Sequence, residues 1–243
     1  NWSPRVGLIY SWSDAHQVFA SLSQGFCAPQ ATELYRLQNS QNIADIDPVE
    51  MDSLELGFRG STEKISYNIA LFSMNKDNFI FRDTSRQNVD NGKTEHHGIE
   101  LDMKIDLHEA VTASVAFTWA EHQYDNNPAL SATPLKGNTI DTAPETLGSM
   151  SIKWQVTPRQ THELEWVHIG KYYEDPENRN EYEGHDLLHL RGSLSMNNSA
   201  RIFYKVMNIT DEDYAERADF SFGSDRYFVG TPRSVYLGLT LTL

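Results

Sequence analysis

The chain has 243 residues, a formal net charge of −14 and a pI near 5.0, with 39% hydrophobic and 11% aromatic residues. An acidic chain without a basic cluster is repelled by the phosphate backbone, so these numbers exclude nucleic-acid binding as a main function. Its single cysteine allows neither an internal disulfide nor a cysteine-based zinc site.

Alternation of apolar and polar residues with a period of two runs through most of the chain and predicts half-buried β-strands. In "GIELDMKIDL" (98–107), four aliphatic residues share one face and four charged residues share the other. No stretch approaches the ~18 apolar residues of a membrane-spanning helix. About eleven strands are expected, at 4–13, 17–24, 53–61, 65–74, 98–107, 111–120, 147–157, 161–172, 186–197, 200–209 and 234–243.

The connections between these strands alternate between tight turns and long polar segments. The long segments are 25–52, 83–96, 121–146, 173–185 and 211–232. In an antiparallel sheet they all fall at one end, which is typical of an up-and-down outer-membrane barrel with short periplasmic turns and long extracellular loops. A small soluble barrel is the alternative, but loops of this total length are unusual around a small core.

Five segments carry a family resemblance. They are "SPRVGLIYSWSDAHQVFASLSQGFCAPQATELY" (3–35), "LELGFRG" (54–60), "NGKTEHHGIELD" (91–102), "VMNITDEDYAE" (206–216) and "GTPRSVYLGLTLTL" (230–243). In this order, and over essentially the whole chain, they resemble the later barrel segments of TonB-dependent outer-membrane receptors.

The resemblance implies an all-β, antiparallel up-and-down transmembrane barrel. The family's barrel has 22 strands around an N-terminal plug, so residues 1–243 are expected to be its C-terminal half, without the plug and the N-terminal strands. The implied location is the outer membrane of a Gram-negative bacterium. The implied partners are outer-membrane lipid, lipopolysaccharide and, through the plug, the TonB complex.

The function implied is active transport of a scarce nutrient, most simply a ferric siderophore, with haem or cobalamin as related ligand classes. No enzyme activity and no cofactor are expected, and no nucleophile-and-base or phosphate-loop motif is present. An outer-membrane barrel that acts alone as a surface binding module or passive channel is the main alternative. A soluble β-enzyme is a third.

Aromatic and arginine side chains on the long loops suit a planar or catecholate chelate through stacking and charge-assisted hydrogen bonds. Ordinary loop packing is open for each of them. The candidates are Tyr35, Arg36, Phe81, Arg82, His96, Tyr172, Tyr173, Arg226 and Tyr227.

Three further features are not expected to carry chemistry. His96 and His97 are adjacent on a strand and point to opposite faces, so they do not share a metal ion, and His96 is expected to line the pore alone. "HELEW" (162–166) lacks the second histidine of a zinc-protease motif. Cys27 stands where the resembling segment usually has arginine, and we interpret it as an incidental substitution.

Overall fold

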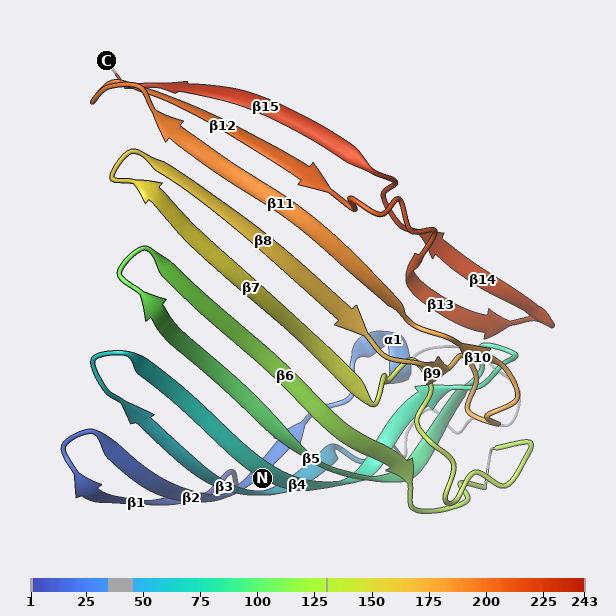
Figure 1. Ribbon diagram of the computed structural model, residues 1–243. Coiled ribbons are helices and arrows are strands. Elements are labelled where there is room, and N and C mark those ends of the chain that lie inside the picture. Colours follow the sequence, from blue (N-terminus) through green and yellow to red (C-terminus); the bar gives the residue numbers. More distant parts are fainter. Residues whose placement is uncertain (1, 35–45, 130, 243) are drawn as a thin grey trace.

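The computed structural model describes residues 2–34, 46–129 and 131–242, which form an almost entirely β structure (Figure 1). One sheet contains eleven antiparallel strands in the order β1-β2-β3-β4-β5-β6-β7-β8-β11-β12-β15. The prediction of eleven strands in an up-and-down antiparallel arrangement is therefore confirmed. Their bounds are Arg5–Ser13, His16–Cys27, Val49–Ser61, Ile65–Arg82, Asn88–His108, Val111–Tyr124, Thr146–Thr157, Gln160–Ile169, His185–Ser195, Ala200–Met207 and Ser234–Leu241.

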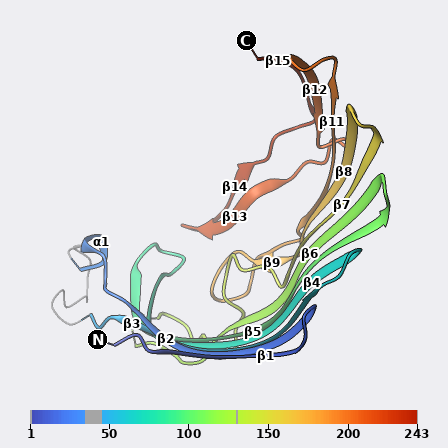
Figure 2. The same ribbon diagram turned by 90° about the vertical axis from the view of Figure 1, so that its left-hand side faces the viewer.

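The sheet curves into an open trough whose edges are β1 and β15 (Figure 2). Short turns join the strands at one end and long connections join them at the other (Figure 1). The long connections contain the short helix α1 (Ala31–Leu34) and two hairpins, β9–β10 (Tyr172–Tyr173 and Glu181–Tyr182) and β13–β14 (Ala215–Ser221 and Ser224–Val229). The second hairpin lies inside the concavity (Figure 2).

One predicted loop is mostly strand. We expected 83–96 to be a connection, but β4 runs to Arg82 and β5 begins at Asn88, so only 83–87 join them. The outer part of this hairpin keeps its backbone ladder, with register shifts between Lys76 and Phe81. Several buried residues of β5 in this part are polar, namely Asn88, Thr94 and His96, so apolar and polar residues do not alternate and the periodicity signal is lost.

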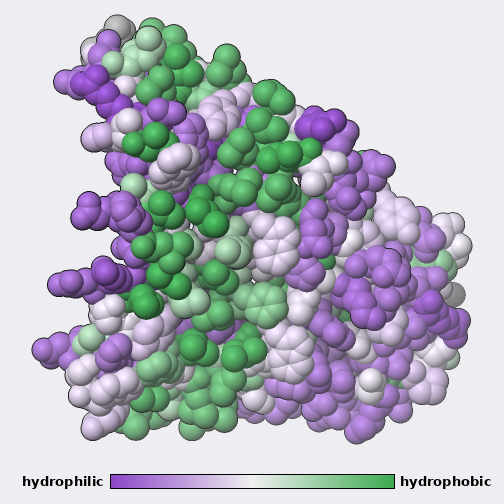
Figure 3. Space-filling model, viewed as in Figure 1, coloured by the Kyte–Doolittle hydropathy of each residue, from purple (hydrophilic) through white to green (hydrophobic). Residues whose placement is uncertain are grey.

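The convex face of the sheet is apolar and exposed. Leu8 is 70% exposed and Leu237 is 79% exposed, and similar side chains continue across the strands between them. Figure 3 shows them as a hydrophobic band between polar zones at the turn end and the loop end. An apolar exterior with a polar interior is the pattern of a barrel wall that faces lipid. No helix within residues 2–34, 46–129 and 131–242 has the length and apolar character required to cross a membrane.

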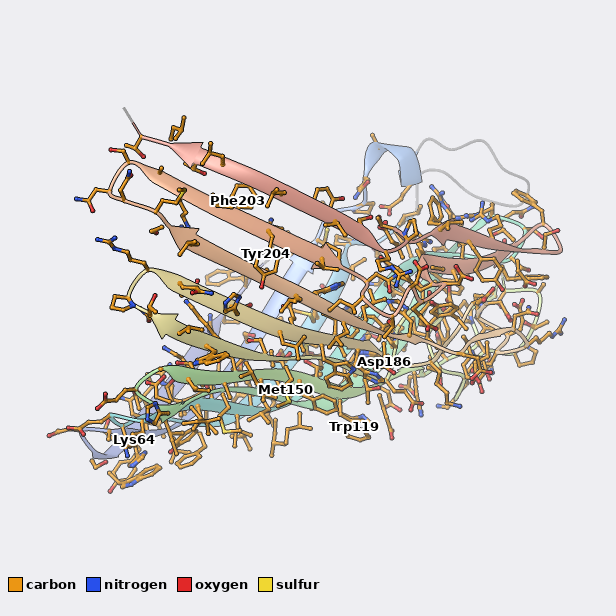
Figure 4. The ribbon with its side chains drawn as sticks, turned by 45° about the horizontal axis from the view of Figure 1, so that its top comes forward. Lys64, Trp119, Met150, Asp186, Phe203 and Tyr204 are labelled. Carbon is orange, nitrogen blue, oxygen red and sulfur yellow. The ribbon has the colours of Figure 1, made fainter. Side chains whose placement is uncertain are left out.

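Aromatic side chains gather on the convex face near the short turns. Trp12 stacks on Phe58 at a centroid distance of 5.0 Å, and Phe58 packs against Tyr67 at 4.9 Å. His162 of "HELEW" belongs to a second such group, in which its Nδ1 lies 2.7 Å from the hydroxyl oxygen of Tyr204. Figure 4 labels Tyr204 on its strand. Both groups match the interfacial aromatic girdles of membrane barrels.

Glycines opposite aromatic residues recur across the sheet. At each such pair the aromatic ring covers the position that a glycine Cβ would occupy, so the cross-strand neighbours fill each other's space. The pairs in register are Phe19–Gly57, Tyr67–Gly60, Phe72–Gly98, Phe117–Gly148, Tyr204–Gly192 and Phe203–Gly238.

The substitution Gly57→Val is expected to lower the free energy of unfolding by about 1–3 kcal/mol, because its side chain overlaps the ring of Phe19. Urea unfolding of the protein at its natural length in detergent measures the effect. Gly25→Val in the neighbouring strand is the control, since its Cβ meets nothing nearer than Met51 Cε at 3.9 Å. Equal losses in the two variants would show that backbone freedom, not the ring, is responsible.

Asn208 locks the connection between β12 and the β13–β14 hairpin. It is 1% exposed and has a positive φ of 50°. Its Nδ2 donates to the carbonyl oxygens of Glu212 at 2.9 Å and Thr231 at 3.2 Å, and its Oδ1 accepts from the Glu212 amide. This explains physically why an asparagine opens the "NITDEDY" segment.

The substitution Asn208→Asp is expected to lower the free energy of unfolding by about 2–3 kcal/mol. A carboxylate cannot donate a hydrogen bond, and it would face the carbonyl oxygens of Glu212 and Thr231. Faster amide hydrogen exchange in the β13–β14 hairpin is the readout. Asn197→Asp is the matched control, since Asn197 accepts from the Ser199 amide through its Oδ1, which a carboxylate oxygen can also do. The assignment fails if Asn208→Asp exchanges no faster than the control.

Candidate functional site

A pocket of about 350 Å³ lies at the loop end of the trough, where four segments that are distant in sequence meet. The outer part of the β4–β5 hairpin supplies one wall, the β6–β7 connection a second, the segment after β9 a third and β13 a fourth. Its lining residues are Phe79, Phe81, Arg82, Asp83, Arg86, Tyr124, Ile140, Asp141, Thr142, Glu174, Pro176, Arg217, Asp219, Phe220 and Ser221.

Aromatic rings and guanidinium groups share this pocket. Phe79 stacks on Phe81 at 6.0 Å, and Phe81 packs against Tyr124 at 5.1 Å. Phe81 and Tyr124 are buried with Val89 and Leu135, which makes the aromatic wall part of a small core. Arg82, Arg86 and Arg217 line the same pocket. The pocket therefore offers donors for anionic oxygens beside the partly exposed ring of Phe79, which the buried rings of Phe81 and Tyr124 support.

A buried carboxylate holds the β13–β14 hairpin against this wall. Asp219 is 5% exposed and accepts from Arg226 Nε at 2.6 Å. Its second oxygen lies 3.2 Å from Arg217 Nη2 and 3.6 Å from Arg86 Nη2. The amide of Phe222 donates to the Thr84 carbonyl oxygen at 2.9 Å, which ties the hairpin to the tip of β4–β5.

Two acidic groups in the pocket hold their protons more tightly than an exposed carboxyl does. Burial raises the pKa of Asp141 to about 6, although Tyr124 donates to Asp141 Oδ1 at 2.9 Å. Burial also raises the pKa of Glu174, and Asp225 adds to the effect. Below pH 6 the pocket therefore carries less negative charge beside its arginines.

The structure places some predicted ligand residues in this pocket and others elsewhere. Phe81 and Arg82 both line it. Tyr35 and Arg36 lie outside the described residues. Tyr172 is buried, and its hydroxyl accepts from the Ala218 amide at 2.8 Å, a contact that anchors the hairpin. Ligand contact by any of these residues stays a prediction.

The remaining candidates have other surroundings. Arg226 pairs with Asp219. Burial raises the pKa of Tyr227, and the neighbouring Glu174 adds to the effect. Tyr173 belongs to β9, and its carbonyl oxygen accepts from the Thr142 amide at 2.8 Å. His96 is 8% exposed and lies farther down the concave face.

Of the residues that line the pocket, only Phe81 and Arg82 were predicted from the sequence. Arg86, Tyr124, Asp141 and Arg217 are among those that were not. Arg86 and Arg217 lie on different hairpins, and no local pattern reveals that one carboxylate pairs with both. Tyr124 lies beyond the predicted end of its strand, in a segment that we interpreted as loop. Cys27, in contrast, is exposed at the end of β2, and its Sγ donates weakly to the Ala28 carbonyl oxygen at 3.6 Å.

Several solved structures share this fold. The siderophore receptor PiuA from Acinetobacter baumannii is similar at 17% identity with a TM-score of 0.82, covering 98% of this chain and 35% of that protein. The ferric yersiniabactin uptake receptor FyuA from Yersinia pestis is similar at 18% identity with a TM-score of 0.81. The match covers 98% of this chain and 36% of that protein. The ferric citrate transporter FecA is similar at 18% identity with a TM-score of 0.81. The match covers 98% of this chain and 38% of that protein.

The chain thus spans little more than a third of the length of these proteins, and at this identity the likeness shows the fold alone. No curated protein sequence matches the chain. The family described as "TonB dependent receptor-like, beta-barrel" matches residues 1–209. This match covers most of the chain and agrees with the curved sheet, its lipid-type exterior and its single end of long loops. The chain belongs to the TonB-dependent receptor β-barrel family, whose members are transport receptors and not enzymes.

Proposed function

We propose that the chain is part of an outer-membrane receptor of a Gram-negative bacterium that captures an anionic metal chelate, most simply a ferric siderophore, for TonB-energised import. The observation that carries the proposal is the loop-end pocket, in which three arginines stand beside the Phe79–Phe81–Tyr124 aromatic wall. Iron chelates present carboxylate, catecholate or hydroxamate oxygens around a flat or rounded apolar body. Arginine and aromatic groups bind both parts of such a ligand.

The trough supports the same proposal. Its polar concave face, with the pocket at the loop end, is the half of a barrel wall that a solute would pass. We propose that the receptor contains further strands that pair with β1 and β15, together with a plug that contacts the TonB complex. Lipid surrounds the apolar band, and lipopolysaccharide surrounds the loop end.

Deleting the gene and growing the strain on defined ferric chelates tests the function. Loss of growth on one chelate, with loss of uptake of its radioactive iron, is the expected result. Uptake that stops when the proton gradient is collapsed supports energised transport. Uptake that persists without the gradient would instead support a passive channel, and unchanged growth on every chelate would support a surface binding module.

Arg82→Gln is expected to weaken chelate binding about tenfold, the effect of one charge-assisted hydrogen bond of roughly 1.4 kcal/mol. Arg82 is exposed, and its guanidinium is not part of the Asp219 cluster, so the fold should persist. Arg179→Gln is the matched control, because Arg179 is exposed at the same end of the molecule but does not line the pocket. Equal binding by the two variants would contradict the pocket assignment.

Chelate affinity is expected to fall about tenfold as the pH rises from 5 to 7, because Asp141, whose pKa is about 6, then ionises and repels an anionic ligand. The probe is a ferric chelate whose own charge is constant over this range. Asp141→Asn keeps an acceptor for the Tyr124 hydroxyl and should flatten the profile. An unchanged slope in that variant would exclude Asp141 as the titrating group.

A further inference from the structure

Three potential metal-binding side chains form a row across the concave face, below the pocket. His96 lies opposite Met74 in the β4–β5 ladder and opposite His122 in the β5–β6 ladder. Residues directly opposite each other share a face and have Cβ atoms about 5 Å apart. From the sequence we expected His96 to be a lone imidazole, but the register places the Met74 thioether on one side of it and the His122 imidazole on the other.

The two imidazoles already face each other. His96 Nδ1 lies 2.8 Å from His122 Nδ1, and the rings are 5.0 Å apart. Two nitrogens that each bind a metal at about 2.0 Å subtend an angle of about 90° at this separation. This is the angle between neighbouring ligands in a square-planar or tetragonal site, a geometry that indicates Cu(II) or Ni(II) among common metals.

The hydrogen-bond partners of His96 allow a tautomer that suits metal binding. Its Nε2 lies 2.9 Å from Thr94 Oγ1, within a site where both residues are buried, at 8% and 2% exposure. When Nε2 donates its hydrogen to this hydroxyl, Nδ1 keeps a lone pair that points at His122. Histidines that bind metals are usually fixed in this way by a partner at the other ring nitrogen.

The thioether of Met74, the third side chain in the row, narrows the choice of metal. Thioethers are soft ligands that favour copper, above all Cu(I), and imidazole binds copper in both oxidation states. Lys76 is the nearest cation along β4, and its ammonium lies over the Phe79 ring at 5.8 Å. A positive charge on the same face disfavours a doubly charged ion more than a singly charged one, which again favours Cu(I).

We propose that Met74, His96 and His122 form a copper site on the concave wall. The site does not depend on the proposed chelate pocket, although the two are adjacent. Tyr124, which lines the pocket, lies two residues after His122 in β6 and therefore on the same face. It is opposite Thr94 of β5. Within the described residues, the nearby His97 faces the opposite way, where its Nε2 lies 3.1 Å from Glu121 Oε2.

Copper titration of the protein, purified at its natural length in detergent, tests the site. The probes are Cu(II) sulfate, followed by electron paramagnetic resonance, and Cu(I) under a reductant with a competing chelator. The wild type is expected to bind one copper ion tightly, with splitting from two nitrogens in the Cu(II) spectrum. His96→Ala and His122→Ala should each weaken binding roughly 100-fold.

Two further variants separate the site from adventitious binding. His97→Ala is the matched control, because it removes an imidazole from the same strand but from the opposite face, and it should leave the affinity unchanged. Met74→Leu keeps the volume and should lower Cu(I) affinity about tenfold while changing Cu(II) affinity little. His122→Gln keeps a neutral polar group and serves as the binding variant if His122→Ala does not fold.

Three results would overturn the proposal. One is an equal loss of copper affinity in the His97→Ala and His96→Ala variants. Another is tight binding of Zn(II) without tight binding of copper. The last is copper binding by the wild type that appears only at millimolar concentration. None of these results affects chelate uptake through the pocket, so the two proposals fail independently.

Discussion

The unbroken backbone ladder is the constraint on which the rest of this structure depends. The convex side chains are apolar, and backbone groups next to an apolar medium must find all their hydrogen-bond partners in neighbouring strands. Twelve consecutive residue pairs join β2 to β3 without a register shift. Register shifts lie at the two ends of the sheet: at Ser11/Ser13, Asp106/His108 and Gln155/Thr157 beside the short turns, and between Lys76 and Phe81 in the outer part of the β4–β5 hairpin. The apolar band itself therefore keeps a single register.

A single register fixes the direction of every side chain, because a slip of one residue would exchange the two faces. This is why His96 and His97, adjacent in the chain, have unrelated surroundings: one contacts His122 and the other Glu121. The glycine–aromatic pairs depend on the same constraint. An aromatic ring can fill the space above a glycine only if the two residues stay directly opposite each other.

The loop end is organised differently, by buried charge instead of by a ladder. Asp219 gathers arginines from β13, β14 and the tip of the β4–β5 hairpin, and Asn208 fixes the chain that leads into the β13–β14 hairpin. Burying a carboxylate with its arginine partners carries a free-energy penalty, because the charged groups lose their water. The clearest effect of such a cluster is to specify one arrangement of the groups around it. Here that arrangement sets the pocket walls. Two of the pocket arginines, Arg86 and Arg217, are therefore positioned by a network that also has to be broken for the hairpin to move.

These two modes of organisation explain what could be predicted from the sequence. Alternating residues such as Ile99 to Ile105 report the faces of a strand directly, so the sheet, its strand count and its long-loop end were predictable. The outer half of the β4–β5 hairpin was misread, because β5 buries the polar residues Asn88, Thr94 and His96 there, which leaves no alternation of apolar and polar residues to detect.

Tyr172 and Phe81 show why the site was harder to predict. Both are aromatic residues in or near a long loop. The hydroxyl of Tyr172 anchors a hairpin, whereas the ring of Phe81 lines a pocket. Contacts between segments decide the difference, and they leave no trace in local composition. The same holds for Met74, His96 and His122, whose common row depends on the register of three strands.

The overall charge bears on how an anionic ligand would reach the pocket. The chain carries a formal charge of −14, so its long-range field repels anions and does not steer them inwards. Attraction must then come from the arginines at close range, within a Debye length of about 8 Å at physiological ionic strength. Salt screens the long-range repulsion more effectively than it screens contacts inside a partly enclosed pocket. For such a ligand, added salt should speed association and change dissociation little, the reverse of the behaviour of an electrostatically steered complex.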